Sequence, residues 1–559
     1  MKKKFLKIKK VLGLLLTLAL AFSSISPFGK PPSAFANQNN TFRVTEYYIS
    51  GTSFSGTTYE LTLNQNLESN HFILVRGSAQ LDTKRGADDN YVRVDQLPSG
   101  MNGELGTSSG SNKIRLARYA SDGDWVGVVT VVECLGDCST SGFRRLDVVE
   151  TTTSGTGTSD TDTSGTAWSD INQVVLFGGA FGAGSNVQAA DASAYYHTSA
   201  WLRLYPSGTN TINWERYNGG SRGLQTAVHT IYVIEWGSEW TIQRVNVSGT
   251  NGGDGINGTG EYNTGSITSV ARANTWAWGT GYSYDDGIGD GAEGVAVTLG
   301  DGVNQNDNET SVAIGSEYTD NKSFDVYTMT HPNLAVDYRF KADGNKSDNT
   351  VDVTVDSATS GYRMGWGSNG CSGTVNFYPG PIFSARYTTN TNVQLERGYD
   401  GKDFPAWVEG IDFSGITYNP APTAPTSLLT EGETNPTGIT DTTPEFSAIG
   451  HDPDSGDTLT DYDIEVDDDS EFGSPIWHPG KTDITDFTEG NRCSDISYAG
   501  PALTRGTKYY WRIKFWDDSD EASPWSTEEA YFTLNQLPTA PDQLLTEGET
   551  NPTGITDTT

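Results

Sequence analysis

Residues 422–443 read PTAPTSLLTEGETNPTGITDTT, and residues 538–559 repeat this stretch as PTAPDQLLTEGETNPTGITDTT. The copies differ at two positions, and their starts at residues 422 and 538 lie 116 residues apart. A period of this length matches a whole domain, so it predicts tandem modules that each have their own core. We therefore expect one module over residues 422–535 and the start of a truncated second copy over residues 538–559.

A weaker repeat recurs four times between residues 40 and 418. Each copy holds the same four apolar stretches in the same order, and the first of them ends in glycine. These first stretches are FILVRG (72–77), VVLFG (174–178), WAWG (276–279) and MGWG (364–367). Alternation of apolar and polar residues, with Gly, Asn, Asp and Ser in the connections, is typical of half-buried strands and turns.

The repeats predict an all-β fold of tandem antiparallel β-sandwich modules with an Ig-like architecture. A chain of 559 residues is also too long for a single hydrophobic core. The predicted sandwich boundaries are 40–139, 140–239, 240–335 and 336–418. Connections between them are short, so we expect a fairly stiff rod or a packed pair of pairs.

The module over 422–535 follows a proline-rich linker and carries three recognisable stretches. They are TPEFS (443–447), LTRGTKYYWRI (503–513) and PWS (524–526). With these stretches the module resembles a fibronectin type III domain. The resemblance implies a tyrosine corner at Tyr509, inward-facing Trp511 and Ile513, and a binding or spacer role without chemistry.

The N-terminus has the pattern of an export signal. Six lysines among the first ten residues precede the apolar run 11–22, and Ala34-Phe35-Ala36 supplies small residues for a signal peptidase. These features predict a signal peptide over residues 1–36. A membrane-spanning helix, the alternative, needs about 20 apolar residues, and this run is shorter. No other segment is apolar enough to span a bilayer, so we expect a secreted or cell-surface protein.

The chain is strongly acidic. Its formal net charge of −35 would become −42 once a signal peptide with seven lysines is removed. Nucleic acid is therefore not expected as a partner, because its phosphates would be repelled. The expected partner is a cell-surface or extracellular glycan or protein. The excess of carboxylates fits both solubility and the binding of divalent cations.

The four cysteines do not form a framework. Cys134 and Cys138 are close enough for one small-loop disulfide in an oxidising compartment, while Cys371 and Cys493 stand alone in separate modules. The sequence leaves both the disulfide and free thiols open.

Two acidic loops of the last module are candidate metal ligands. In a type III-like sandwich, the loop after the second strand and the loop after the sixth strand meet at one end. They carry Asp452, Asp454 and Asp457 in the first loop and Asp517, Asp518 and Asp520 in the second. Ca²⁺ takes roughly six to eight oxygen ligands in irregular geometry, so these loops predict a calcium site. The alternative is a pair of solvated acidic turns.

Three tryptophans lie in the first apolar stretch of the third and fourth copies: Trp276 and Trp278 on one strand face, and Trp366 at the equivalent place. Trp276, Trp278 and Trp366 align with plain aliphatic residues in the first two copies, which favours a place in the core. If the three rings were exposed instead, they could stack on sugars.

No serine-hydrolase, metalloprotease, phosphate-loop or dinucleotide motif is present. Glycoside hydrolysis needs only two carboxylates at a fixed separation, and Asp285, Asp286, Asp290 and Glu293 are candidates. Carboxylates are common throughout, however. The sequence therefore favours a non-catalytic protein for adhesion, display or surface architecture. The alternative is a secreted carbohydrate-active enzyme or glycan-binding protein with accessory modules.

Overall fold

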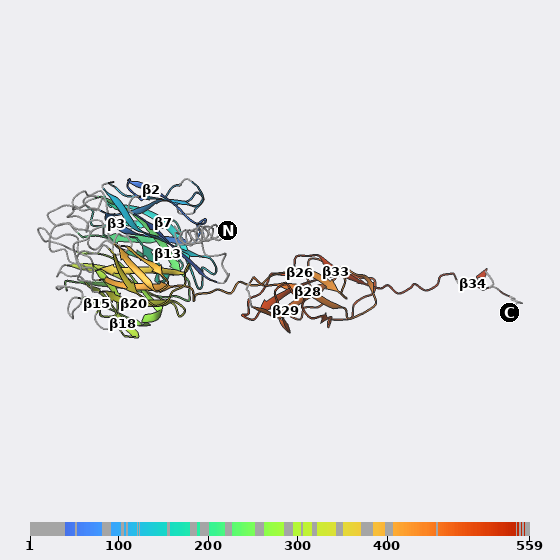
Figure 1. Cartoon of the computed structure of the whole chain (residues 1–559). Coiled ribbons are helices and arrows are strands. Elements are labelled where there is room, and N and C mark those ends of the chain that lie inside the picture. Colours follow the sequence, from blue (N-terminus) through green and yellow to red (C-terminus); the bar gives the residue numbers. More distant parts are fainter. Residues whose placement is uncertain are drawn as a thin grey trace, which may run out of the picture. The chain divides into compact units, whose positions relative to one another are not determined.

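The computed structural model describes most of the chain from residue 40 to residue 553. The residues in this range that it does not describe are 51–52, 81–90, 102–104, 108–109, 120, 122, 154–156, 179–186, 190–200, 218–225, 252–261, 284–294, 303–305, 316–320, 342–349, 370–383, 397–405, 454–456, 544, 547–548 and 551–552. The described residues form two compact units, one over 40–418 and one from 419 onward (Figure 1).

The predicted all-β class is confirmed. Apart from two short 3-10 segments, Ile171–Gln173 and Arg272–Asn274, the regular structure of the described residues consists of strands. In this part of the chain, no helix has the length and apolar character that crossing a membrane requires.

The first unit contains four repeats of one strand plan. The first repeat holds β1 (Phe42–Ile49), β2 (Thr58–Thr62), β3 (His71–Gln80), β4 (Arg93–Gln96), β5 (Lys113–Ala117) and β6 (Asp124–Cys134). The second holds β7 (Phe143–Thr153), β8 (Ser159–Thr163), β9 (Val174–Phe177), β10 (Val187–Ala189), β11 (Arg203–Ser207), β12 (Thr211–Glu215) and β13 (Ala227–Trp236). The third holds β14 (Thr241–Gly249), β15 (Tyr262–Ala271), β16 (Thr275–Ser283), β17 (Ala296–Leu299), β18 (Asn308–Gly315) and β19 (Lys322–Thr330). The fourth holds β20 (Ala335–Lys341), β21 (Thr350–Thr354), β22 (Arg363–Asn369), β23 (Ser384–Thr389), β24 (Asn392–Glu396) and β25 (Ala406–Asp412).

Each repeat folds into two antiparallel sheets. The first, last and third strands form the inner sheet, in the orders β1-β6-β3, β7-β13-β9, β14-β19-β16 and β20-β25-β22. The remaining strands form the outer sheet, in the orders β2-β5-β4, β8-β12-β11, β15-β18-β17 and β21-β24-β23. In the second repeat, β9 and β10 both pair with β13 and share the third position. The apolar stretches ending in glycine form the third strand of every repeat or, in the second, its first part, β9.

The third and last strands of the inner sheets are buried on both faces. In β9, Val174 and Leu176 pack between the two sheets of their own repeat. Val175 and Phe177 point the other way and join a cluster that contains residues of all four repeats. Because successive side chains of a strand point to opposite faces, a strand covered on both sides becomes a continuous apolar run.

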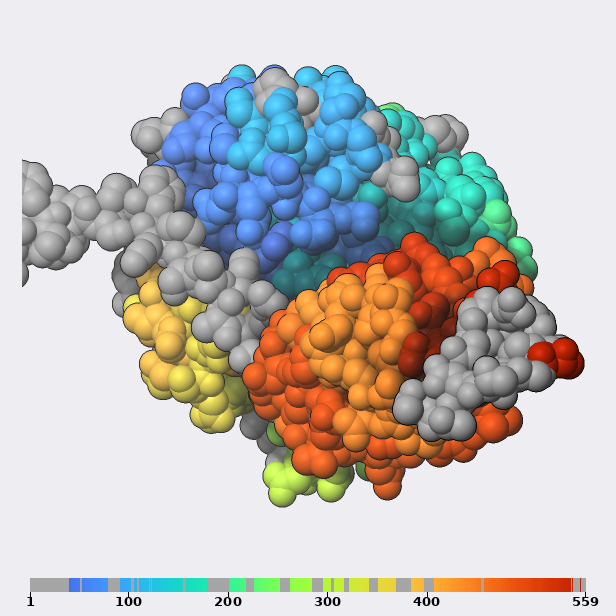
Figure 2. Space-filling model, turned by 90° about the vertical axis from the view of Figure 1, so that its right-hand side faces the viewer, coloured from blue at the N-terminus to red at the C-terminus, as the bar shows by residue number. Residues whose placement is uncertain are grey.

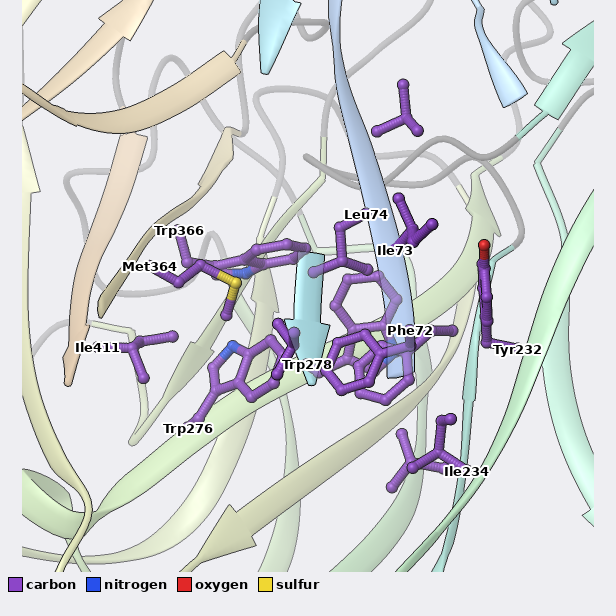
Figure 3. Packing of buried hydrophobic residues seen from close by; sticks show 14 of the residues in the cluster. Phe72, Ile73, Leu74, Tyr232, Ile234, Trp276, Trp278, Met364, Trp366 and Ile411 are labelled. Carbon is purple, nitrogen blue, oxygen red and sulfur yellow. The ribbon is translucent and has the colours of Figure 1, made fainter. Parts of the chain in front are cut away.

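This shared cluster is the central core of the first unit (Figure 3). Ring centroids of Phe72 and Phe177 are 4.3 Å apart, those of Phe177 and Trp278 are 5.2 Å apart, and those of Trp278 and Trp366 are 4.8 Å apart. These four rings come from four different repeats. The repeats thus bury a second apolar face against one another, in addition to cores between their own two sheets such as those of the second and fourth repeats.

The four repeats also close on themselves. The fourth strand of each repeat contacts the inner sheet of the next one, as in β4 with β13, β11 with β19, β17 with β25 and β23 with β6. The last contact joins the fourth repeat to the first, and an antiparallel bridge pairs Asn40 with Thr417. We call this arrangement the closed ring. It differs from the predicted stiff rod and is nearer to the predicted alternative, a packed pair of pairs.

The second unit is a separate β-sandwich with its own core. Its main strands are β26 (Thr423–Thr430), β27 (Thr437–Ile439), β28 (Glu445–His451), β29 (Thr458–Asp467), β30 (Thr482–Thr488), β31 (Ile496–Ser497), β32 (Lys508–Asp517) and β33 (Ala530–Leu534). They form the sheets β26-β28-β31 and β27-β33-β32-β29-β30, and a small sheet of β34 (Leu545–Thr546) and β35 (Glu549–Thr550) follows. The orange and red segments of this unit form one continuous surface in Figure 2, consistent with the pairing of β27 with β33.

The predicted tyrosine corner has the expected hydrogen bond. The backbone N–H of Thr504 donates to the hydroxyl oxygen of Tyr509 over 2.8 Å. Trp511 and Ile513 are buried, and the ring of Trp511 lies 4.8 Å from that of Phe446 in the facing sheet.

Candidate functional site

Three of the predicted acidic ligands converge in the second unit. Asp452 follows β28, Asp517 ends β32, and Asp457 immediately precedes β29. One carboxylate oxygen of each residue lies within 4.8 Å of one from each of the others. Asp452 and Asp517 are buried and Asp457 is half-buried. Carboxylates held this close repel one another, and a hard cation such as Ca²⁺ would relieve that repulsion.

Asp517 is fixed in place by its own hydrogen bonds. Its Oδ1 accepts the backbone N–H groups of Ser519 and Glu521 over 3.0 and 2.8 Å. Its Oδ2 accepts the side-chain amide of Asn419 over 2.7 Å, which ties the start of the unit to this end of the sandwich. The carboxylate is thus pre-oriented by the backbone of its loop.

Two other predicted ligands, Asp518 and Asp520, do not join this group. Asp518 and Asp520 are exposed, and Asp520 forms an ion pair with Lys481 instead. Asp454 lies outside the described residues. The acidic group that remains is Asp452, Asp457 and Asp517, and calcium binding by it stays a prediction.

The three candidate stacking tryptophans lie in the central core. Trp276, Trp278 and Trp366 expose 0%, 1% and 4% of their surfaces. Their rings pack edge-on or tilted against one another (Figure 3). Burial leaves no ring face for a sugar, so the glycan-stacking alternative is corrected to core packing.

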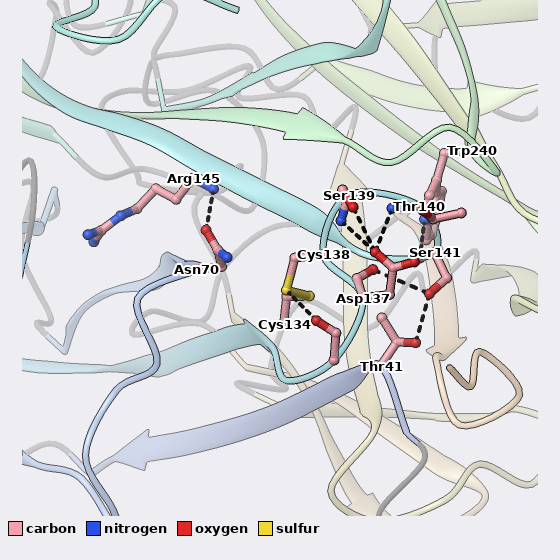
Figure 4. The surroundings of a disulfide bond; sticks show 11 residues. Thr41, Asn70, Cys134, Asp137, Cys138, Ser139, Thr140, Ser141, Arg145 and Trp240 are labelled. Atoms are coloured by element: carbon pink, nitrogen blue, oxygen red, sulfur yellow. Dashed lines mark hydrogen bonds between the residues drawn. A yellow bond between two sulfur atoms is a disulfide. The ribbon is translucent and has the colours of Figure 1, made fainter. Parts of the chain in front are cut away.

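A disulfide joins Cys134 and Cys138, whose Cα atoms are 5.8 Å apart (Figure 4). The loop it closes leads from the first repeat into the second. Next to it, the indole N–H of Trp240 donates to the carbonyl of Ser141 over 2.7 Å. Cys493 is buried as a free thiol, and Cys371 lies outside the described residues.

The carboxylates predicted for hydrolysis, Asp285, Asp286, Asp290 and Glu293, also lie outside the described residues. Among the described acids, burial raises the pKa of Glu46 and of Glu409 despite nearby arginines. Glu46 has a structural task, because it accepts the backbone N–H groups of Gly365 and Tyr387, each over 2.9 Å. These bonds join the first and fourth repeats of the closed ring.

Comparison with known proteins concerns mainly the second unit. Residues 425–534 match the family described as the Rha78A-like, N-terminal immunoglobulin domain. The immunoglobulin-like fold expected for this module is thereby supported, in a family other than fibronectin type III.

Curated relatives match about a fifth of the chain. An alpha-L-rhamnosidase of Formosa agariphila is 31% identical over 114 residues, which are 20% of this chain and 11% of the relative. An alpha-L-rhamnosidase of an Alteromonas species is 34% identical over 104 residues, which are 18% of this chain and 11% of the relative. The match thus spans about a ninth of the length of each relative. The solved alpha-L-rhamnosidase of Dictyoglumus thermophilum is 25% identical, with a TM-score of 0.19, over 21% of this chain and 13% of that one.

These findings contradict the predicted function. We expected a non-catalytic protein for adhesion, display or surface architecture, and hence no enzyme. The relatives that share the immunoglobulin-like domain are instead glycoside-cleaving enzymes by name. The alternative, a carbohydrate-active enzyme, agrees better with the comparisons.

Proposed function

We propose that this chain is part of a secreted carbohydrate-active enzyme that acts on alpha-L-rhamnosides. The observation that carries the proposal is the match of residues 425–534 to an N-terminal immunoglobulin domain of Rha78A-like proteins. Two alpha-L-rhamnosidases match about a fifth of the chain at 31% and 34% identity, which supports the substrate class.

Export is a second part of the proposal. The lysine-rich start, the apolar run and Ala34-Phe35-Ala36 form a signal peptide pattern. The disulfide between Cys134 and Cys138 agrees with an oxidising compartment. An extracellular enzyme of this kind meets polymeric glycans outside the cell, where accessory β-sandwich domains can hold the polymer or space the modules.

The direct test is hydrolysis of 4-nitrophenyl alpha-L-rhamnopyranoside. The matched control is 4-nitrophenyl alpha-L-fucopyranoside, which is also a 6-deoxy-L-hexoside but differs in its hydroxyl stereochemistry. We expect release of nitrophenol from the rhamnoside and little from the fucoside. The assay uses both residues 37–559 and the complete product of the gene. If neither hydrolyses the rhamnoside, the proposed function is wrong.

The sequence candidates for the two carboxylates are tested in the same assay. The variants are Asp285→Asn, Asp286→Asn, Asp290→Asn and Glu293→Gln. Loss of a catalytic acid or base lowers kcat by about 10²- to 10⁴-fold. Unchanged kcat in all four variants of an active enzyme would move the chemistry to other residues.

A further inference from the structure

The five-stranded sheet of the second unit has an outer face that combines aromatic and basic side chains. Along β32, residues alternate between buried and half-buried, and the half-buried ones face away from the core. Together with Trp525 from the following loop and Tyr531 from β33, they form what we call the aromatic face. Its members are Lys508, Tyr510, Arg512, Lys514, Trp516, Trp525 and Tyr531.

Trp525 lies flat on two cations of this face. Its ring centroid is 4.8 Å from the guanidinium carbon of Arg512 and 4.7 Å from the ammonium nitrogen of Lys514. Both cations rise from the same strand, so they cover the side of the indole that faces the sheet. Trp525 is half-buried, and the ring of His478 meets its ring edge to face with centroids 6.4 Å apart.

Other rings of the aromatic face lie farther along the strand in both directions. Trp516 lies 4.6 Å from the ammonium of Lys514. At the other end, Tyr510 and Tyr531 pack edge to face with centroids 6.3 Å apart.

The charges of the face are balanced internally. Arg512 forms a 2.6 Å ion pair with Glu465. Lys514 lies 3.8 Å from Asp463, whose Oδ2 also contacts His478 over 3.0 Å. A chain with a net charge of −35 therefore presents a locally neutral surface here. Such a surface has no excess charge to attract an acidic polymer or nucleic acid.

We propose that the aromatic face binds a neutral, rhamnose-containing glycan chain. Sugar rings have an apolar C–H face that stacks on an indole or phenol ring and hydroxyls that pair with charged side chains at the ring edge. The face provides both: half-buried rings, chiefly Trp525 and Trp516, for stacking, and the partly exposed cations of Arg512 and Lys514 for hydroxyls. The inference rests on the proposed function for its choice of sugar.

The test measures binding separately from hydrolysis. The full chain is run in native affinity gels that contain a neutral, unsulfated rhamnan, with polygalacturonate in parallel gels. We expect retardation by the rhamnan only, and at least 10-fold weaker binding in Trp525→Ala. Trp525→Tyr, which keeps a stacking ring, should restore most of the binding. The matched control is Tyr119→Ala, which removes an aromatic ring that is 57% exposed in the first unit.

Thermal melts of each variant show whether it is folded. Equal retardation of wild type and Trp525→Ala, or preference for polygalacturonate, would overturn the inference. So would sedimentation data in which Trp525→Ala dissociates a dimer, because the face would then join two copies of the chain. Failure of the rhamnoside hydrolysis assay with intact rhamnan binding would remove the enzyme proposal and leave this one standing.

Discussion

At the scale of single residues, local geometry explains features that the sequence shows only as a pattern. The glycine that ends FILVRG, Gly77, faces Gly127 across β3 and β6. A Cβ at Gly77 would lie 2.2 Å from the carbonyl oxygen of Val126 and 2.5 Å from the ring of Trp125. The glycine therefore makes room for a buried indole. The sequence identified this position as a landmark, but the reason depends on a strand more than 40 residues away.

Two buried histidines should make the first unit sensitive to acid. Burial, assisted by the charge of Arg145, lowers the pKa of His71 to about 3, and burial with the charges of Arg216 and Arg93 does the same for His229. Because an unfolded histidine titrates near 6.5, the unfolded state binds more protons between pH 6.5 and 3. Stability is therefore fully present above pH 6.5 and falls as the pH drops, by about 1.4 kcal/mol per pH unit for each histidine.

Urea melts of wild type and His229→Gln at pH 7, 6, 5 and 4 check this expectation. The variant should lose stability less steeply than wild type as the pH falls. His478→Gln, which changes an exposed histidine of the second unit, is the control. Parallel pH profiles for wild type and His229→Gln would show that the buried imidazole does not set the slope.

Trp511 should be a main contributor to the stability of the second unit. Its ring is 2% exposed and packs against Phe446, so Trp511→Ala removes a large buried side chain and leaves a cavity. The expected loss in the free energy of unfolding is about 3 to 5 kcal/mol. A denaturant melt measures it, with Trp516→Ala as the half-buried comparison on the same strand. Similar losses in the two variants would contradict the assignment of inward and outward positions.

At the scale of elements, the sequence predicted strands well where they are apolar and less well where they are not. The first apolar stretch of each copy lies in β3, β9, β16 or β22, and each of these strands belongs to an inner sheet. The opening strand β1, FRVTEYYI, was missed as a landmark, because Glu46 and two tyrosines interrupt its apolar pattern. A carboxylate stands at Glu46 because it accepts hydrogen bonds from two backbone N–H groups of the fourth repeat. No pattern within one repeat reveals such a partner.

The acidic group of the second unit was likewise predicted only in part from the sequence. Sequence reasoning brought the two loops together, and Asp452, Asp457 and Asp517 do converge. The positions of Asp518 and Asp520 could not be predicted, because they depend on how the turn after β32 directs each side chain. Asp517 points inward since the N–H groups of Ser519 and Glu521 hold it.

Calcium should stabilise the second unit if these three carboxylates bind it. At about 100 times its dissociation constant, a ligand adds about 2.7 kcal/mol to the free energy of unfolding. Thermal melts in millimolar calcium and in chelator should therefore differ for wild type and agree for Asp457→Asn. Asp518→Asn, exposed and outside the group, is the matched control and should behave as wild type. Identical melting temperatures for wild type in both buffers would leave these loops as solvated turns.

At the scale of the whole molecule, the four repeats are not separate modules, because they share the central core. The sequence repeats suggested four sandwiches in a row, whereas the structure packs their inner sheets around shared rings such as Phe177 and Trp278. Sequence periodicity shows that units are alike but does not show which surfaces they bury against each other. The extra signal was the absence of polar alternation in VVLF, which marks a strand covered on both faces.

The closed ring should tolerate new termini but not the loss of a repeat. Asn40 and Thr417 are paired, and the N–H of Thr41 donates to the carbonyl of Ile416 over 3.0 Å, so a short Gly-Ser link can join residues 418 and 40. A permutant of residues 40–418 opened between Ser99 and Gly100, which are exposed in the connection after β4, should keep the melting temperature of the unpermuted unit within a few degrees.

Residues 40–335 alone should fail to melt cooperatively, because removal of the fourth repeat takes Trp366 away from Trp276 and Trp278 and exposes the central core. Circular dichroism and calorimetry of the three chains provide the comparison. A three-repeat chain as stable as the ring would show that the repeats are independent sandwiches after all.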